Sequence, residues 1–246
     1  MRGWHKKRRV MICYDTTASI YDKRYAEEQA AKVEAALKNV KIEKEWLILD
    51  VGCGTGILFD HVADEVDGIV GLDFSKKCLL QAKERIRNRS LRDVQLIQAD
   101  ADNMPFHNEV FNTVFAMTIL QNTPSPNETL GEIKRVLRND ALFVITGLKK
   151  IFTKEDFERL LKNSQLNTLV LEDEKLKCYV AVCTNPPIVG PSVSQKRLES
   201  RSEPAMHKRN KNPTWRSSST LSTDCKSISH HCAGQNQRGQ LHPNSS

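Results

Sequence analysis

The sequence predicts an α/β fold: a Rossmann-like, doubly wound sheet of seven mostly parallel strands with an antiparallel last strand, followed by a disordered tail. Three observations support this. Short apolar runs alternate with helical patterns across residues 14–185. The first of these runs enters a glycine-rich turn at residues 52–56. The last two runs are separated only by residues 172–175, which leaves room for a hairpin but not for a crossover helix.

The expected elements follow in chain order. A helical pattern around Tyr21 to Val40 comes first, and Trp46 to Asp50 is then a continuous apolar run typical of a strand buried on both faces. Similar runs lie at 68–72, 94–99, 111–117, 141–146, 168–171 and 177–183. Between them, helices are expected to begin at Ser75, at Thr153, and at the capping box formed by Ser125 and Glu128 with Pro126.

Composition divides the chain into three parts. Residues 1–13 form a basic N-terminal arm, residues 14–185 the ligand-binding domain, and residues 186–246 a Ser-rich basic tail. The tail contains twelve serines and only scattered aliphatic residues, which bury too little apolar surface to offset the entropy of ordering. We therefore expect a single folded domain with a disordered tail.

The net charge of +7 belongs to the two ends, because the first nine residues contain five Lys or Arg and no acid. Basic ends are compatible either with RNA binding or with solvation alone. The seven cysteines form no CxxC pair and follow no signal peptide, which favours a reduced, cytoplasmic protein. No apolar run approaches the ~18 residues that a membrane span requires.

Two acidic and glycine-rich segments lie where consecutive strands are expected to end. The first strand leads into Asp50, Gly52, Cys53, Gly54 and Gly56, and the second ends at Asp73. Glycines let a ligand approach the backbone, and a carboxylate about 20 residues further on can meet the ribose of a bound nucleoside. Since Ile57 occupies the place of the third glycine of a dinucleotide fingerprint, the pattern is GxGxG.

This pattern resembles the first motif of class I S-adenosylmethionine-dependent methyltransferases. The second and third motifs of that family resemble residues 71–75 and 98–106, so the resemblance covers about residues 14–183. Residues 120–123 through 135–137 further resemble the type 11, quinone-biosynthesis branch, although Arg138, Asn139 and Asp140 replace its usual Lys-Pro-Gly-Gly turn.

The resemblance implies S-adenosylmethionine as cofactor and gives individual residues a role. Glycines 52, 54 and 56 would pass under the methionine part, and Asp73 would accept from both ribose hydroxyls. Asp100 would accept from the adenine amino group, and Ala101 would donate its backbone N–H. The alternative for each aspartate is a helix cap or a turn. The full expected cofactor-binding set is Asp50, Gly52, Cys53, Gly54, Gly56, Asp73, Phe74, Asp100, Ala101 and Tyr21.

Further candidates are open to two interpretations. Tyr14-Asp15 and Tyr21-Asp22 resemble aromatic-acid pairs that close over the cofactor, but their spacing of seven also fits packing over two helical turns. Asn122 is a weak candidate for orienting the methyl acceptor, with a simple turn residue as the alternative. Basic residues between Lys76 and Arg89, including Arg85, Arg87 and Arg89, are expected on a solvated helix face.

Two other patterns are set aside. Asn185-Pro186-Pro187-Ile188 resembles an amide-methyltransferase motif but is displaced from its usual place after the fourth strand. The four residues Cys225, His230, His231 and Cys232 lack regular zinc-ligand spacing, so no metal is expected.

The sequence therefore predicts an enzyme that transfers a methyl group from S-adenosylmethionine to an O, N or C acceptor, with a small molecule favoured. The alternatives are an RNA (tRNA) methyltransferase, a non-catalytic nucleic-acid-binding protein with a methyltransferase fold, and the related aminopropyl transfer of spermidine synthases. RNA binding is expected only through the basic ends, and the acceptor itself is not specified.

Overall fold

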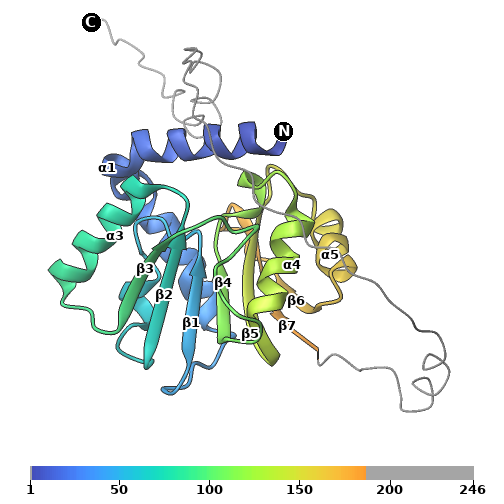
Figure 1. The fold of residues 1–246 in the computed structure, drawn as a ribbon. Coiled ribbons are helices and arrows are strands. Elements are labelled where there is room, and N and C mark those ends of the chain that lie inside the picture. Colours follow the sequence, from blue (N-terminus) through green and yellow to red (C-terminus); the bar gives the residue numbers. More distant parts are fainter. Residues whose placement is uncertain (1, 187–246) are drawn as a thin grey trace, which may run out of the picture. The chain divides into compact units, whose positions relative to one another are not determined.

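A computed structural model describes residues 2–186 of the chain, and the expected tail from residue 187 onward lies outside the described residues. Figure 1 shows alternating strands and helices around one sheet. The helices are α1 (Arg2–Leu37), α2 (Phe59–Val62), α3 (Lys76–Arg89), α4 (Pro126–Val136) and α5 (Lys154–Asn163), with a short 3-10 helix η1 (Leu120–Asn122). The strands are β1 (Leu47–Val51), β2 (Gly68–Asp73), β3 (Val94–Gln98), β4 (Phe111–Ala116), β5 (Leu137–Leu148), β6 (Asn167–Leu171) and β7 (Cys178–Thr184).

The sheet has seven strands in the order β3-β2-β1-β4-β5-β7-β6. The neighbouring pairs from β3 through β5 are parallel, whereas β7 is antiparallel to both β5 and β6. The expected doubly wound sheet with an antiparallel last strand is thus confirmed. The short β6–β7 connection forces the reversal because it is too short for a crossover.

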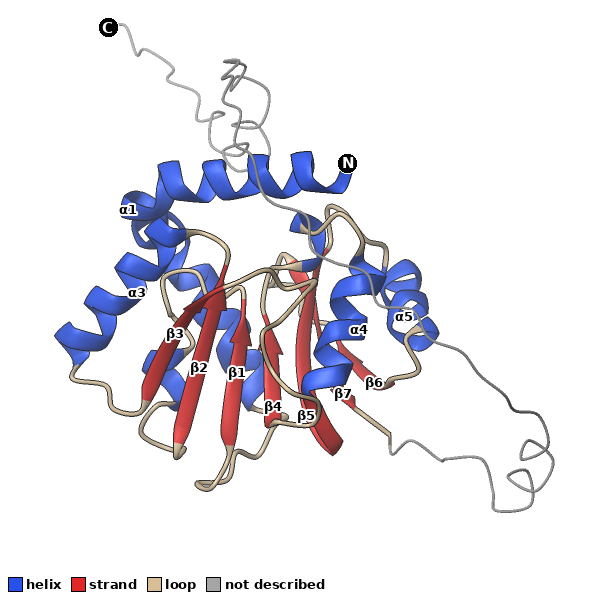
Figure 2. Cartoon of the chain, in the orientation of Figure 1, coloured by secondary structure: helices blue, strands red, loops and turns tan. Residues whose placement is uncertain are grey.

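Helices cover both faces of the sheet (Figure 2). Successive strand residues point to opposite faces, so neighbouring side chains enter different cores. Leu49 and Val114 belong to the cluster that includes α4 and α5, and Ile48 and Phe115 belong to the cluster that includes α1, α2 and α3. Burial of each such side chain contributes about 1.5–3 kcal/mol to folding.

Two of the three expected helix caps are formed as side-chain hydrogen bonds. The Ser75 hydroxyl accepts from Cys78 N at 3.1 Å, and the Thr153 hydroxyl accepts from Asp156 N at 3.1 Å. The predicted capping box at Ser125 is wrong, because its side chain accepts no bond from α4. The helix still begins at Pro126, whose ring fixes the backbone angle that a first helical residue needs.

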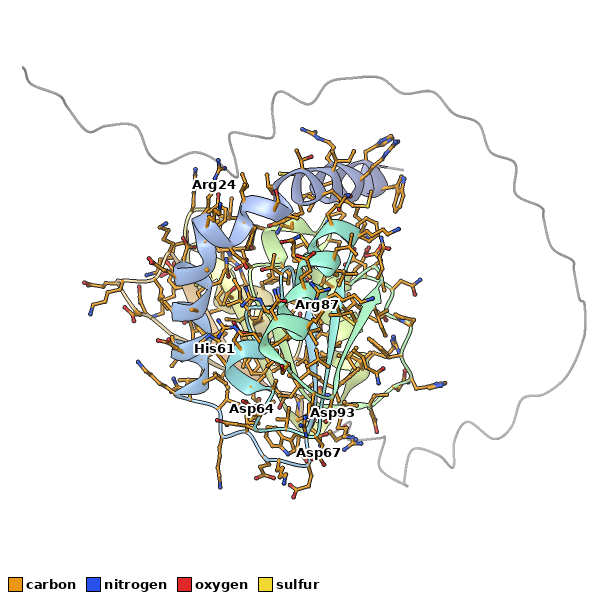
Figure 3. The ribbon with its side chains drawn as sticks, turned by 90° about the vertical axis from the view of Figure 1, so that its left-hand side faces the viewer. Arg24, His61, Asp64, Asp67, Arg87 and Asp93 are labelled. Carbon is orange, nitrogen blue, oxygen red and sulfur yellow. The ribbon has the colours of Figure 1, made fainter. Side chains whose placement is uncertain are left out.

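The N-terminal helix α1 runs without interruption from Arg2 to Leu37, so residues 2–13, expected as a basic arm, are helical and continuous with the residues that follow. Its first half lies across the carboxyl edge of the sheet, and its second half runs down one side after a bend near Arg24 (Figures 1 and 3). We call residues 3–21 the roof segment. Among the described residues, no helix has the length and apolar character needed to cross a membrane.

Candidate active site

A cavity of about 830 Å³, its open mouth included, lies at the carboxyl ends of β1 to β4. Ligands of open α/β sheets bind in this position. Its walls come from the turn after β1, the end of β2, the loop after β3, the region after β4 and the roof segment. Among the expected site residues, Gly52, Gly54, Asp73, Phe74, Asp100, Ala101, Tyr21 and Asn122 line it.

The glycine turn forms one wall, and its conformation explains its composition. Gly52, Gly54 and Gly56 have φ angles of 73°, 55° and 80°, a region that other residues enter only with strain. A Cβ atom on Gly56 would lie 2.6 Å from the ring of Phe59. Backbone bonds hold the turn against β2, because Gly52 N donates to Leu72 O at 2.7 Å.

Asp73, at the end of β2, is held by the backbone on both sides. Its Oδ2 accepts from Gly54 N at 2.8 Å and its Oδ1 from Ser75 N at 2.7 Å. Burial raises the pKa of Asp73, while these N–H donors act in the opposite direction. Each carboxylate oxygen has more than one lone pair, so the two bonds fix the side chain without using up its capacity to accept.

Asp50, Cys53 and Gly56 are set back from this cavity. Asp50 and Cys53 line a smaller adjoining hollow together with Tyr21 and Gln29. Burial raises the pKa of Asp50 to about 8, and the neighbouring charge of Asp73 adds to the shift. The structure therefore separates the expected set into residues that face the cavity and residues that support its glycine wall.

The loop after β3 places Asp100 and Ala101 on the opposite wall. Asp100 Oδ1 accepts from Asp102 N at 3.0 Å, and Oδ2 accepts from the Lys7 ammonium at 2.7 Å. Lys7 also lies 2.6 Å from Asp102 Oδ2. Burial alone would lower the pKa of Lys7, but its bonds to the two aspartates outweigh this effect and raise the pKa. The expected adenine-binding carboxylate is therefore already paired with the roof.

The roof segment closes the cavity from above. Val10, Met11, Tyr14 and Tyr21 line it, and the rings of the two tyrosines are 6.0 Å apart. This arrangement supports the interpretation of the tyrosines as residues that cover the site.

Asp15, in the roof segment, and Asp22, just after it, connect α1 to the loops that follow β1 and β2. Asp15 accepts from the Ser75 hydroxyl at 2.6 Å, and Asp22 accepts from the Thr55 hydroxyl at 2.6 Å. Asp22 also pairs with Arg85 at 2.6 Å, so the expectation that Arg85 is a solvated residue is wrong. Arg87, by contrast, points outward from α3 (Figure 3).

The region after β4 supplies the last wall. Asn122 Nδ2 donates to the Tyr14 hydroxyl at 3.0 Å and to Thr118 O at 3.0 Å. Thr118 has a φ of 61°, an uncommon value for a non-glycine residue. Asn122 is thus more than a turn residue, because it connects this wall to the roof segment.

Sequence reasoning missed a buried polar network beneath the roof. Lys32 is only 1% exposed, pairs with Glu28 at 2.9 Å and lies 3.3 Å from the Thr118 hydroxyl. The same hydroxyl donates to Gln29, whose amide donates to the Tyr21 hydroxyl at 3.2 Å. Only the Glu28–Lys32 spacing of one helical turn signalled any of this.

In the part of the chain that the structure describes, no group of three or more His, Cys, Asp or Glu side chains is arranged to bind a metal ion. The set-aside pair of histidines and cysteines at residues 225–232 lies outside the described residues.

Known proteins resemble this chain along the same region. A family model described as a methyltransferase domain matches residues 42–205. The demethylmenaquinone methyltransferase of Lactobacillus johnsonii is 36% identical over 107 residues, which are 42% of this chain and 44% of that protein. The phosphatidylethanolamine N-methyltransferase of Cereibacter sphaeroides is 35% identical over 101 residues, 41% of this chain and 49% of that protein.

The chain thus spans less than half the length of these two curated relatives. Among solved structures, a SAM-dependent methyltransferase from Aquifex aeolicus superposes with a TM-score of 0.62 at 17% identity, covering 69% of this chain and 97% of that one. That likeness shows the fold. The resemblance to class I methyltransferases with a quinone-biosynthesis-like character is confirmed, and the chain belongs to the methyltransferase domain family.

Proposed function

We propose that the protein transfers a methyl group from S-adenosylmethionine to a small, largely apolar acceptor. The observation that carries the proposal is a single cavity that brings together the glycine wall, Asp73 and Asp100 on the cofactor side and Asn122 and Tyr14 on the other.

Open space at the glycine turn and the charge of the lining support binding of the cofactor in this cavity. A Cβ atom on Gly54 would meet no atom within 4 Å, so the turn leaves open space beside the backbone. Asp73 is positioned to accept from ribose hydroxyls, and Asp100 and Ala101 line the side proposed for adenine. The charged lining side chains are three aspartates and Lys7, an acidic balance that favours a cationic sulfonium.

We assign the acceptor to the part of the cavity beside Asn122 and Tyr14. The cavity lining includes the apolar side chains Val10, Met11, Ile119 and Pro124, and Asn122 provides a polar group. Asn122 donates its two amide N–H groups to Tyr14 and Thr118, which leaves its carbonyl oxygen as the atom that can accept from an O–H or N–H of the acceptor. An apolar body with one polar reactive group fits these walls.

The chemistry needs little more than alignment. When bound, the cofactor supplies an electrophilic methyl group on its sulfonium. The roof segment and the apolar walls exclude water, and Asn122 with Tyr14 holds the acceptor in place. Orientation of two reactants can supply roughly 7–11 kcal/mol of a barrier. The proton that an O–H or N–H acceptor loses on methylation passes to solvent at the open mouth of the cavity.

The roof segment favours a small acceptor over a macromolecule. It lies across the carboxyl edge of the sheet, the side from which a folded RNA or protein would approach (Figure 1). The only cationic side chain that lines the described cavity, Lys7, is neutralised by Asp100 and Asp102 and therefore offers no phosphate contact. The two curated relatives are named for methyl transfer to demethylmenaquinone and phosphatidylethanolamine.

The direct test is methyl transfer from labelled S-adenosylmethionine by the purified full chain into separated cell fractions. We expect the label in organic-extractable small molecules. Asn122→Ala should lower the transfer rate while leaving calorimetric cofactor affinity within about twofold. Label that enters RNA or protein would overturn the acceptor class, and absence of cofactor binding in the folded wild type would overturn the function itself.

A further inference from the structure

The outward face of the roof segment combines exposed apolar side chains with basic ones. Ile12 and Ile20 are 39% and 37% exposed and lie eight residues apart, so their directions around the helix axis differ by about 80°. Trp4 lies further round the helix, where its ring packs edge-on against Phe74. Arg8 lies one helical turn before Ile12 and is exposed as well. We propose that this face of α1 binds an anionic lipid surface, with Ile12 and Ile20 entering the headgroup region.

The charge distribution along α1 suits such a surface. No acidic residue occurs before Asp15, and that carboxylate is turned to the protein, where it accepts from Ser75 and Lys77. Lys7 also points inward, to Asp100, so the basic charge left on the outward side includes that of Arg8. Basic residues beside an anionic bilayer are attracted to it over about one Debye length.

The opposite end of the molecule carries acidic side chains. Asp64, Asp67 and Asp93 are exposed and lie together at the amino edge of the sheet (Figure 3). Exposed basic residues such as Lys44 and Arg92 adjoin these aspartates, so this end carries both signs of charge and offers an anionic surface less attraction than the roof segment does.

Other exposed apolar side chains follow the same edge. Leu80, in α3 after β2, and Ile151, just after β5, are 44% and 49% exposed. Both elements begin at the carboxyl ends of parallel strands, the edge that the roof segment crosses. Among the large apolar side chains that are exposed in the described part of the chain, only Leu169 in the edge strand β6 lies elsewhere.

Lipid fits this surface better than RNA does. The phosphates of an RNA would use Arg8, but the aliphatic side chains Ile12 and Ile20 give nothing to a phosphate contact or to base stacking. In the interface of a bilayer, the same aliphatic groups leave water.

The inward face of the same segment connects this surface to the site. Val10, Met11 and Tyr14 line the cavity from α1, while Ile12 lies on its outer side. A docked roof segment would therefore bring the cavity mouth to the lipid, where an apolar acceptor is dissolved. This step rests on the proposed function, whereas lipid binding itself does not.

The test uses the full chain and vesicles of neutral lipid with or without 30 mol% anionic lipid, a composition chosen to be on the order of that of anionic membrane leaflets. We expect co-sedimentation with the anionic vesicles only. Ile12→Gln with Ile20→Gln should weaken partitioning about tenfold, and Arg8→Gln about fivefold. Leu169→Gln, the same kind of substitution at an exposed site in β6, should leave vesicle partitioning unchanged. All variants keep the same basic C-terminal residues, so the differences report on α1.

A second readout follows the outward face directly. With Trp4→Phe, Trp46→Phe and Trp215→Phe, a tryptophan introduced by Ile12→Trp is the sole one of the chain, and its emission should shift to shorter wavelength on anionic vesicles. Vesicle binding that is absent, or equal in the isoleucine variant and the wild type, would overturn the proposal. Binding of bulk transfer RNA that needs Arg8 but neither isoleucine would assign the face to RNA instead. Methyl-transfer activity is not part of either readout, so failure of the proposed function leaves this test intact.

Discussion

The floor and the roof of the cavity are held by different kinds of interaction. The floor, residues 50–56 with Asp73, is fixed by main-chain groups of adjacent strands, such as Gly52 N to Leu72 O and Gly54 N to Asp73. The roof segment is fixed by side chains, such as Lys7 with Asp100 and Asp15 with Ser75. Main-chain bonds between adjacent strands leave the floor little freedom, so we expect the roof segment, which is attached by side chains, to open more readily than the floor.

The largest effect is expected from the carboxyl buried in the floor. The pKa of Asp50 is raised to about 8, so the folded state favours its protonated form. The stability that this raised pKa contributes is fully present below the ordinary pKa of an aspartate and is lost as the pH rises through about 8. Chemical denaturation should therefore show a free energy of unfolding that falls between about pH 4 and pH 8, by on the order of 5 kcal/mol.

Asp50→Asn removes this titration, so its unfolding free energy should lose most of the slope and exceed that of the wild type at pH 9. Asp67→Asn, at an exposed position, serves as the matched control and should keep the slope. Identical pH profiles for wild type and Asp50→Asn would contradict the assignment.

Gly56→Ala tests the main-chain geometry of the floor. The new Cβ would lie 2.6 Å from the Phe59 ring, at a φ of 80°. Strain and clash together should cost about 3 kcal/mol, and the melting temperature should fall by roughly 6–12 °C. Gly131→Ala, in α4 with open space around it, should instead gain about 0.5–1 kcal/mol. Equal melting temperatures for the two variants would show that the turn tolerates a side chain.

Asp73→Asn tests recognition by the floor. The amide keeps the shape of the side chain but loses the negative charge and one acceptor oxygen, so cofactor affinity should fall at least about tenfold by calorimetry. Asp93→Asn, at an exposed position on the amino edge, should bind as the wild type does. A folded Asp73→Asn protein with wild-type affinity would refute the ribose role.

The smallest effect is expected at the roof. Lys7→Met and Asp102→Asn, alone and combined, form a double-mutant cycle on one ion pair. Because the pair is only partly buried, the coupling energy should be about 1 kcal/mol in the free energy of unfolding. Additive single effects would mean that Lys7 does not hold the roof.

The same division explains what the sequence could predict. The strands, the glycine turn and Asp73 could be predicted, because they follow from apolar periodicity and from a fixed spacing within one β-α-β unit. The positions of Lys7, Lys32 and Arg85 could not be predicted, because each is buried or paired by groups far away in the sequence. Lys7 and Asp100, for example, are 93 residues apart. The N-terminal arm is an example. Five basic side chains among the first nine residues predict a solvated arm as long as their partners in the fold are unknown.

Residues that serve as supports were also hard to separate from residues that face the ligand. Asp50 and Cys53 belong to the same motif as Gly54, yet they line a hollow beside the main cavity. The motif specifies which residues come together, and the alternation of side chains along β1 and its turn decides which of them face inward.

Hydrogen exchange of backbone amides in wild type and Lys7→Met tests the contrast between floor and roof most directly. If side-chain pairing holds the roof, amides of residues 3–21 should exchange about fivefold or more faster in the variant, as expected for ~1 kcal/mol less local stability, while residues 47–56 keep their wild-type rates. Equal acceleration in both segments, or none in the roof segment, would contradict the account.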